Sequence, residues 1–517
     1  MVYKSLLSTV TAIAVAATVS TASAADLKIG LGAAVSSMDP LFYVIGSNSA
    51  MARNIFDGLI NQDDKQQLKP GLALAWKPVD DTTWEFKLRQ GVKFHDGSDF
   101  TAEDVAATIR RVPLASQNSP SSFMRYVSEI KDIVIVDPFT IRFKTAAAAP
   151  LLPSNLSRIG ILPKSLETTP SKALNDGNGV IGTGPFKFVK WQPGDGVVLA
   201  GNAAYWGGKV AWDTVTFKFI TNATSRVAAL LAGDVDLIED VPTADLGTIA
   251  KNAKARLASA GSNRVMYLHM DQDREVSPFA VGPDGKNPLR DVRVRRAMSK
   301  AINRNLLVER IMDGQGVPAG QLVPDGYFGY VPALKPETFD LDGAKKLLAE
   351  AGYPNGFDMT FHASNDRYPN DEKVAQAISQ MFARIGIKMK VETMPAAVYF
   401  PRASKREFSL IMGGAAVETG ESSGVLGPLL ATFTQATGQG NRGRYSNPKF
   451  DQALQTAMKT VDDAKRETLL RDAMTQGMGD LGVIPVFFLL NNWGVRADLA
   501  YQGRADGYTL AHDVTSK

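Results

Sequence analysis

The sequence predicts an α/β protein with two lobes, from its length, its composition and its alternation of strand and helix patterns. At about 150 residues per domain, 517 residues are enough for three or four domains or for two large lobes. Hydrophobic residues make up 44% of the chain and charged residues 21%, and the mean hydropathy is −0.09. These values are typical of a folded soluble protein, and they exclude a disordered, collagen-like or polytopic membrane protein. Strand and helix patterns alternate in both halves, which favours an α/β fold.

The first 24 residues are typical of a secretory signal peptide. They open with Lys4, continue with an apolar stretch from Leu6 to Val19, and end in the small residues Ala22-Ser23-Ala24. Hydroxyl residues interrupt the apolar stretch, which is shorter than the ~20 residues that span a bilayer. We expect cleavage before Ala25. Because the chain has no cysteine, it has no lipid attachment site of the bacterial lipoprotein kind, and we predict a protein that is free in the periplasm.

Strand and helix signals follow one another through the first half. Leu27–Ala33 has the composition of a short buried strand. In Thr83–Arg89 apolar and charged residues alternate, as in a strand with one buried face. Thr101, followed by an acidic residue three positions later, predicts the N-cap of a helix that continues through Val105–Arg111. Further strands are expected at Val134–Val136, Phe139–Phe143, Val197–Ala200 and Thr216–Ile220.

Amphipathic helix patterns dominate the second half. Apolar residues recur at helical spacing from Val292 to Met312, which predicts one helix whose arginines form a solvated face. Leu341–Ala351 and Lys373–Ile385 are each followed by a glycine, the usual helix stop, and Asn447-Pro448 predicts the start of a helix over Lys449–Lys459. Strands are expected between these helices at Met359–His362, Lys388–Glu392 and Phe408–Ile411, and later at the apolar run Ile484–Leu490.

Composition excludes several classes of function. The formal net charge of +4 is small for this length, which argues against a nucleic-acid-binding protein. The absence of cysteine excludes a thiol nucleophile, Cys-ligated zinc and iron–sulfur clusters. Only four histidines are present, so dense His-based metal or acid–base chemistry is not expected. We therefore predict no cofactor, no metal and no enzymatic activity.

Three strings resemble enzyme motifs, but their context in the chain argues against each of them. Gly420-Glu421-Ser422-Ser423-Gly424 matches a hydrolase pattern, but the only later histidine is His512 in the C-terminal tail. Gly438–Gly443 matches a dinucleotide-binding pattern without the strand and helix that such a site needs on either side. The last string is acidic and is interpreted as a solvated charge run; it comprises Asp234, Asp236, Glu239 and Asp240.

An ordered series of segments resembles the substrate-binding proteins of peptide-type ABC transporters, which form solute-binding protein family 5, or cluster C. Its members span most of the chain: Gly71–Trp76, Trp84–Gly97, Phe100–Val105, Gly182–Phe186, Asn202–Gly208, Leu289–Ala297, Ala301–Arg304 and Ala344–Pro354. Because these segments keep their order over nearly all of the mature sequence, the resemblance is specific.

The resemblance implies a two-lobe periplasmic-binding-protein fold of type II, cluster C. Lobe I would comprise Ala25–Ser262 with an extra subdomain at about 57–180, and lobe II would comprise Asn263–Val483. The segment Ile484–Lys517 would return to lobe I. The implied function is that of a receptor, presumed monomeric by the resemblance, that captures a peptide-like or amino- and carboxyl-bearing solute between closing lobes and delivers it to an inner-membrane ABC permease.

The resemblance also implies ligand-binding residues. Arg367 and Tyr368 match a loop in which peptide binders hold a ligand carboxylate, although a solvated loop arginine is an equally good interpretation from sequence. Trp493, beside Asn492, can stack on ligand or pack between the lobes. The remaining expected contacts lie in loops beside the cleft and are Ser36, Ser37, Tyr43, Thr183, Asn441 and Arg442.

The loop Gly413–Glu421 departs from the pattern of dipeptide binders, which have a Trp and then an Asp here for the ligand ammonium group. Small residues and Val417 replace them, and Glu418 or Glu421 is the candidate ammonium partner. A standard dipeptide site is therefore in doubt. An opine or oligosaccharide receptor remains an alternative within the family. The alternatives outside it are a secreted serine hydrolase that uses Ser422 and a periplasmic chaperone or sensor without a permease.

Overall fold

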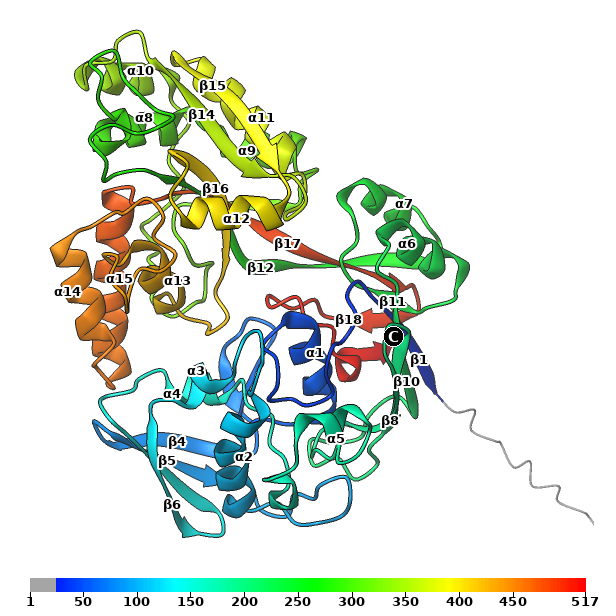
Figure 1. Cartoon of the computed structure of the whole chain (residues 1–517). Coiled ribbons are helices and arrows are strands. Elements are labelled where there is room, and N and C mark those ends of the chain that lie inside the picture. Colours follow the sequence, from blue (N-terminus) through cyan, green and yellow to red (C-terminus); the bar gives the residue numbers. More distant parts are fainter. Residues whose placement is uncertain (1–24) are drawn as a thin grey trace, which may run out of the picture.

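The computed structural model describes residues 25–517 and shows two lobes that are joined by two long strands (Figure 1). The predicted signal peptide lies outside the described residues. Within residues 25–517, no helix combines the length and the hydropathy that a bilayer span requires. The buried apolar residues separate into clusters that belong to one half of the molecule or the other, which agrees with two separately packed cores.

One 11-stranded sheet runs through both lobes, and a short strand lies off its main path, beside β17. Along the sheet the strands follow the order β15 (Ile387–Met394), β14 (Phe357–Ser364), β16 (Leu410–Ala416), β12 (Ala255–Met270), β17 (Ile484–Arg496), β11 (Leu237–Ile238), β1 (Asp26–Leu31), β10 (Thr214–Phe219), β9 (Gly196–Gly201) and β8 (Phe186–Gln192), with β13 (Gly316–Pro318) beside β17.

Strands β12 and β17 are antiparallel neighbours and carry the chain between the lobes (Figure 1). Residues Ala255–Gly261 of β12 pair with Leu490–Arg496, on the lobe I side. The register then shifts between Gly261 and Val265, and beyond that point β12 pairs with the first residues of β17, on the lobe II side. We place the hinge at this irregularity, where ladder hydrogen bonds are interrupted. The predicted returning segment Ile484–Lys517 begins with β17, whose first residues pair with β12 on the lobe II side of this irregularity.

Lobe I carries an additional unit with its own antiparallel sheet, drawn in blue and cyan in Figure 1. Its strand order is β4 (Ala73–Asp80), β5 (Thr83–Leu88), β7 (Thr140–Thr145) and β6 (Ile130–Asp137). A separate hairpin joins β2 (Ile60–Gln62) to β3 (Leu68–Pro70). The lobe I helices are α1 (Gly46–Ile55), α2 (Ala102–Ala115), α3 (Met124–Val127), α4 (Leu152–Leu156), α5 (Ser171–Asn175), α6 (Ala223–Ala232) and α7 (Leu246–Ala250), and β18 (Leu499–Tyr501) pairs with β19 (Val514–Ser516).

Helices surround the lobe II part of the sheet (Figure 1). They are α8 (Val292–Ala301), α9 (Arg304–Arg310), α10 (Leu341–Glu350), α11 (Asp371–Ala383), α12 (Ala396–Ser404), α13 (Ser423–Leu430), α14 (Pro448–Ala457) and α15 (Asp463–Gly479). The predicted starts of two helices are confirmed by their caps: Thr101 and Asp104 form a reciprocal capping box at α2, and the Asn447 side chain accepts from backbone N–H groups at the start of α14.

The single helix that the sequence predicts from Val292 to Met312 is wrong in one respect. The structure has two helices, α8 and α9, because Ile302 is extended and the Asn303 side chain caps a new helix by accepting from the N–H of Leu306. The apolar spacing continues across the break, so the pattern alone does not reveal it.

Candidate functional site

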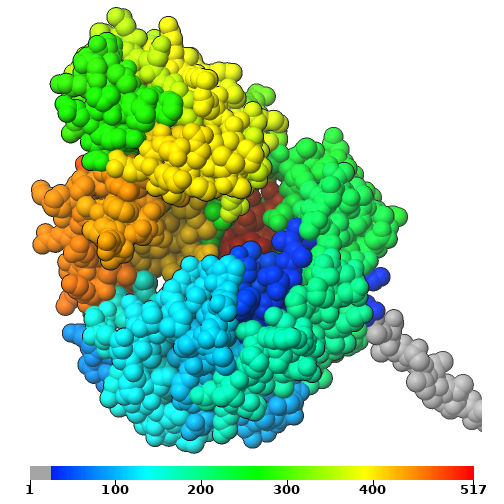
Figure 2. Space-filling view, in the orientation of Figure 1, coloured from blue at the N-terminus to red at the C-terminus, as the bar shows by residue number. Residues whose placement is uncertain are grey.

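A cleft of about 420 Å³ lies between the two lobes, beside the hinge strands. Figure 2 shows it as a hollow between lobe II and lobe I, with the dark red atoms of the C-terminal region at its base. Lobe I contributes the start of α1, the loop after β11 and the segment around Tyr508. Lobe II contributes Arg367 and Tyr368 from the loop after β14. The hinge strands supply Arg264 and Asn492, so both lobes and both crossings face this space.

Two arginines on this cleft have no ion-pair partner. Arg264 lies on β12 just beyond the hinge, and Arg367 lies in the loop between β14 and α11. Among residues 25–517, no carboxylate lies within 4.0 Å of either guanidinium; Arg264 is half-buried and Arg367 is exposed to the cleft. Burial lowers the pKa of Arg264, with a smaller contribution from the charge of Arg367. The two charges make this wall positive, and the nearby Glu418 charge acts on Arg264 in the opposite direction.

The loop that carries Arg367 is held by one carboxylate. Asp371 Oδ2 accepts from the backbone N–H of Arg367 (3.1 Å), from the backbone N–H of Tyr368 (3.2 Å) and from Ser364 Oγ (2.8 Å). The Arg367 guanidinium lies 5.2 Å from the centre of the Tyr368 ring, in cation–π range. A rigid main chain with a free guanidinium is what a preorganised carboxylate site requires.

Two glycines of β16 make room for tyrosine rings in lobe II. The N–H of Gly414 donates to Tyr368 Oη (3.0 Å), and the Tyr368 hydroxyl donates to the Gly414 carbonyl (3.3 Å). A Cβ at Gly414 would lie 2.8 Å from the Tyr368 ring, and one at Gly413 would lie 2.8 Å from the Tyr267 ring. The small residues that depart from the dipeptide-binder pattern therefore have a structural reason, since larger ones would displace these rings.

Lobe I presents three acidic residues to the cleft, Glu239, Asp240 and Asp506, of which Asp506 pairs with Arg504 (2.9 Å). Glu239 accepts from the N–H of Gly32 (2.9 Å) and from Thr509 Oγ1 (2.7 Å). Burial raises the pKa of Glu239, and the neighbouring Asp240 charge raises it further; burial also raises the pKa of Asp240. Within residues 25–517 the Asp240 carboxylate accepts no hydrogen bond, so it is available to a donor on a ligand.

Glu418 lies on a contact between the lobes. Its carboxylate is 3.6 Å from the Arg158 guanidinium of lobe I, and its side chain is half exposed. Its carbonyl accepts from Gln62 (3.2 Å) and from Gln66 (3.1 Å), both on the β2–β3 hairpin of lobe I. The pKa of Arg264 responds to the charges of Arg367, Tyr368 and Glu418, so these groups lie near one another. The last three were predicted from sequence.

Other predicted residues have internal partners. Glu421 is buried and pairs with Arg466 (2.6 Å) and with Ser423, which leaves it no capacity for a ligand. Trp493 is buried and its indole N–H donates to Thr509, so of the two interpretations the structure favours packing. Four more predicted residues donate hydrogen bonds within their own lobe: the Ser36 N–H to Asn48, the Ser37 hydroxyl to Asn175, the Thr183 hydroxyl to Asp57, and the Asn441 amide to the carbonyls of Ala431 and Tyr445.

Of the last three predicted residues, one lines the cleft and two do not. Asn492 does line the cleft, where it donates to Gln315 (2.8 Å) and accepts from Ser259 (2.6 Å). Arg442 lies over the Phe400 ring at 5.7 Å, within lobe II, and Tyr43 is half-buried in the loop before α1. Neither residue lines the cavity, so the sequence predictions for them have no support from this geometry.

Sequence reasoning missed Arg264, Asp240 and Tyr508. Arg264 directly precedes the buried residues Val265–Leu268 of β12, and a charge at the edge of such a run is a signal that could have found it. Asp240 was noted only as part of an acidic run. Tyr508 lies in a segment without a regular element, and nothing in the local pattern indicates that it faces the cleft.

The enzyme-like strings acquire no catalytic geometry. Ser422 is fully buried, and its hydroxyl has no hydrogen-bond partner among the described residues, so the structure provides no histidine base for it. Gly438–Gly443 forms turns beside α13 rather than a strand–helix junction. Within residues 25–517 no group of acidic and histidine side chains is arranged to hold a metal ion.

Comparison with known proteins gives a consistent result. Residues 67–437 match the family model described as bacterial extracellular solute-binding proteins, family 5 middle. The glutathione-binding protein GsiB of Pectobacterium atrosepticum is 30% identical over 473 residues, which cover 88% of this chain and 87% of that protein.

Solved structures extend this similarity to the fold. HbpA2 of Haemophilus parasuis superposes with a TM-score of 0.81 at 26% identity and covers 95% of this chain and 100% of its own. The periplasmic binding protein DppA of Helicobacter pylori, in complex with the peptide STSA, gives a TM-score of 0.72 at 26% identity, over 95% and 98% of the two chains.

Proposed function

We propose, from the premise that this chain belongs to the family 5 bacterial extracellular solute-binding proteins, that its solute is a small peptide with two carboxylates and one amino group, of the glutathione class. The predicted family, the two-lobe α/β fold and the receptor function are confirmed. The chain is a solute-binding receptor that delivers its ligand to an ABC permease. The proposal concerns the identity of the solute and the residues that hold it.

The observation that carries the proposal is the pair of unpaired arginines on the cleft. An arginine fork matches a carboxylate with two parallel hydrogen bonds, and such charge-assisted bonds are about twice as strong as neutral ones. Arg264 and Arg367 offer two such forks on one wall. A ligand with a single carboxylate would leave one of these charges uncompensated when the lobes close and exclude water, at a cost of several kcal/mol by the usual desolvation penalty.

The opposite wall supplies the partner for an amino group. Asp240 is unpaired and faces the cleft from lobe I, across from the arginines of lobe II. A ligand held by its carboxylates on lobe II and by its ammonium on Asp240 would contact both lobes, and it would therefore bind the closed form better than the open form. That differential affinity is what drives closure. Glu418, the sequence-based candidate, is already engaged with Arg158 and takes second place.

Relatives support the same chemistry. The curated relative at 30% identity is named for glutathione, a tripeptide with two carboxylates and one free amino group, and a structural neighbour was solved with a peptide. The two unpaired arginines and one unpaired carboxylate of this cleft match that charge pattern group for group. An opine shares the pattern in part, whereas an oligosaccharide would leave all three charges unpaired.

Isothermal titration of the mature protein, residues 25–517, tests the proposal. The panel comprises glutathione, dipeptides, opines and oligosaccharides. We expect glutathione or another dicarboxylate peptide to bind tightest, Arg367→Met to weaken it at least about 100-fold, and Asp240→Asn to weaken it about 10-fold. Arg310→Gln is the matched control, because the Arg310 side chain is 71% exposed and, within residues 25–517, pairs only with its neighbour Glu309. Equal binding of monocarboxylate and dicarboxylate peptides would contradict the charge assignment.

The same samples decide the remaining alternatives. A serine hydrolase would lose its activity in Ser422→Ala, and we expect neither esterase activity in the parent nor any loss of ligand binding in the variant. We further propose that the mature protein is a periplasmic monomer that begins at Ala25. N-terminal sequencing of the periplasmic fraction and light scattering test those two statements, and an intact N-terminus in the membrane fraction would refute the first.

A further inference from the structure

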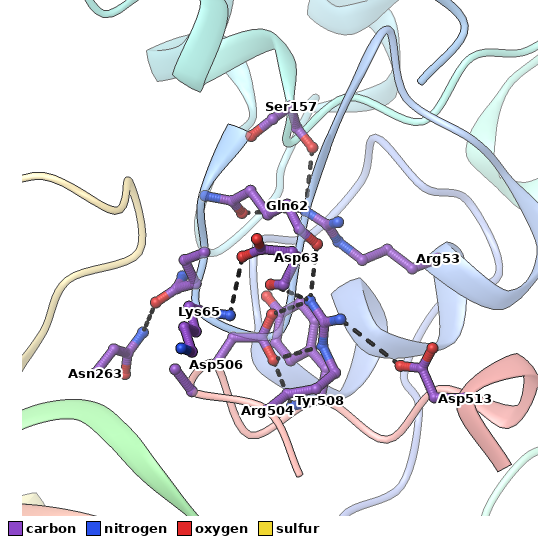
Figure 3. A network of polar contacts seen from close by, with 12 residues as sticks. Arg53, Gln62, Asp63, Lys65, Ser157, Asn263, Arg504, Asp506, Tyr508 and Asp513 are labelled. Atoms are coloured by element: carbon purple, nitrogen blue, oxygen red, sulfur yellow. Dashed lines mark hydrogen bonds and ion pairs between the residues drawn. The ribbon is translucent and has the colours of Figure 1, made fainter. Parts of the chain in front are cut away.

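A second cavity, of about 430 Å³, lies entirely within lobe I. It is bounded by the side of α1 that carries Ser49 and Arg53, by the loop after β2, by residues 157–160 and by the returning segment 502–513. Figure 3 shows the polar groups at one end of it, with Arg53 pointing toward Gln62 and Ser157. Its volume is within the range of small-molecule sites, and no residue of lobe II lines it.

Two arginines share a single neutral acceptor at this end. Gln62 Oε1 accepts from Arg53 Nη2 (3.3 Å) and from Arg158 Nη1 (3.5 Å), and Arg53 Nη2 also donates to the Ser157 carbonyl (3.1 Å). Both guanidinium carbons lie 5.8 Å from the centre of the Tyr508 ring. No carboxylate among residues 25–517 lies within 4.0 Å of the Arg53 guanidinium.

This arrangement is costly unless an anion completes it. The Arg158 side chain is 5% exposed, and its one ion pair is the 3.6 Å contact with Glu418 of lobe II. Burial and the neighbouring charge of Arg158 lower the pKa of Arg53 to about 10, the response of a guanidinium held beside another cation away from water. Two adjacent arginines that share the Gln62 oxygen, and of which only Arg158 has an ion pair, indicate a place for a carboxylate.

The other charged groups of the cavity are mostly satisfied. Arg504 pairs with Asp506 (2.9 Å) and lies 3.7 Å from Asp513. Asp57 accepts from Thr183, Tyr205 and Trp206, and burial raises its pKa. Asp64 is the exception, since within residues 25–517 its carboxylate has neither a hydrogen bond nor an ion pair. The cavity thus has a cationic end, at which Arg158 has an ion pair and Arg53 has none, and one unpaired carboxylate.

We propose that this lobe I cavity is a second binding site, for a zwitterion of amino-acid size. Its carboxylate lies between Arg53 and Arg158, in place of the shared Gln62 acceptor, and its ammonium group faces Asp64. The site is separate from the inter-lobe cleft and does not depend on the solute proposed for it. Because all its lining residues belong to lobe I, the open and closed forms both offer it.

Two contacts connect the cavity to the cleft. Arg158 donates to the hydroxyl of Tyr508 (2.8 Å), and Tyr508 lines the cleft on its other side. Arg158 also contacts Glu418 across the lobes. A carboxylate at Arg158 would compete with Glu418 and weaken that contact between lobes. We therefore expect occupancy of the lobe I cavity to change the affinity of the cleft by about 2- to 10-fold.

The test uses the mature protein with its cleft disabled. In Arg367→Met, titration with individual L-amino acids, and with acetate as a carboxylate-only probe, isolates the lobe I cavity. We expect one amino acid to bind with a stoichiometry near one, and acetate to bind at least 10-fold more weakly. The same event should disappear in Arg367→Met/Arg53→Met and weaken about 10-fold in Arg367→Met/Asp64→Asn, while Arg367→Met/Arg310→Gln keeps it.

Folding controls keep the result interpretable. Each variant is checked by circular dichroism and thermal unfolding, and Ser49→Phe, which fills the cavity from α1 without removing a charge, replaces Arg53→Met if that variant unfolds. No amino-acid binding in Arg367→Met, or binding that persists in both Arg53→Met and Ser49→Phe, overturns the proposal. Loss of cleft binding in Arg367→Met bears only on the proposed solute, so failures of the two proposals are distinguishable.

Discussion

Arginines in two regions of this molecule differ in their ion pairing. In the core of lobe I, Arg111 on α2 and Asp39 are both fully buried and form a two-pronged ion pair, with nitrogen–oxygen distances of 3.0 and 2.6 Å. On the inter-lobe cleft, Arg264 and Arg367 have no carboxylate within 4.0 Å among residues 25–517. The same side chain is thus neutralised in the core of lobe I and left unpaired at these two positions on the cleft.

The difference indicates where stability and binding are located. A buried pair that is complete within the protein offers nothing to a solute, and it is expensive to break because removal of one partner strands the other charge. An unpaired arginine contributes little to stability but gains a partner when ligand arrives. The lobe I cavity combines the two states, since Arg504 is paired and Arg53 is not. The predictions below test this contrast, from the largest expected effect to the smallest.

The largest effect is expected at the paired arginine. Arg111→Met should lower the free energy of unfolding by about 3–5 kcal/mol, because it leaves the Asp39 carboxylate buried without its partner. Guanidinium unfolding measures it. The double variant Arg111→Met/Asp39→Leu should recover most of the loss, and solute affinity in the folded protein should not change. An unchanged free energy of unfolding in Arg111→Met would contradict the claim that this ion pair stabilises the fold.

The second effect separates charge from geometry at the cleft. Arg367→Met should weaken solute binding about 100-fold, or about 2.7 kcal/mol, and leave unfolding within about 0.5 kcal/mol of the parent. Arg367→Lys keeps the charge but loses the planar fork, so we expect a loss of about 10-fold. Titration calorimetry and unfolding measured on the same samples provide both numbers. A large loss of stability in Arg367→Met would place this residue with Arg111 instead.

The third effect is a pH dependence of stability, which arises from the hydrogen-bonded His95 of lobe I. His95 Nδ1 accepts from the N–H of Gly182 (3.2 Å) and Nε2 faces the Gly184 carbonyl (3.0 Å), and burial lowers its pKa from 6.5 to about 4. A lowered folded-state pKa favours the neutral ring, so its stabilisation is present above pH 6.5 and is lost as the pH falls toward 4.

The expected loss for His95 is on the order of 2 kcal/mol across that window. The measurement is the free energy of unfolding at several pH values for the parent and for His95→Gln, whose difference should shrink as the pH falls. His269 and His362, with pKa values lowered by burial to about 3 and about 4, remain in both proteins and contribute equally. A pH-independent difference would show that His95 has only a packing role.

The smallest effect concerns the contact that joins the two regions. Gln66 donates to the Glu418 carbonyl and accepts from Asn263 (2.9 Å) and Tyr327 (2.6 Å) of lobe II. These bonds hold the lobes in the arrangement of Figure 2, in which the cleft is open to solvent. Gln66→Ala should therefore favour closure and raise the apparent affinity about 3-fold, as titration would measure. The exposed Lys65→Ala, on the same hairpin, is the control, and a weakened affinity in Gln66→Ala would mean that the bonds persist on closure.

Much of the fold and part of the site were predictable. The capped starts of α2 and α14 depend on side chains within three or four residues of the helix end, so local sequence specifies them. Arg367, Tyr368 and Asn492 were found through the resemblance to the family, and all three line the cleft. The break between α8 and α9 was missed because the apolar spacing continues across it. Glu421 was misleading because its partner, Arg466, is 45 residues away in the chain.

The sequence by itself determined the class of this protein. Its composition excluded thiol and metal–cysteine chemistry, its βα alternation specified an α/β fold, and its ordered motifs specified the family. Only the tertiary structure decided which charges are neutralised. Arg111 finds Asp39 at a separation of 72 residues, whereas Arg264 and Arg367 find no carboxylate within residues 25–517. Ion pairing depends on distances of a few ångströms between segments far apart in the chain, and no local pattern encodes those distances.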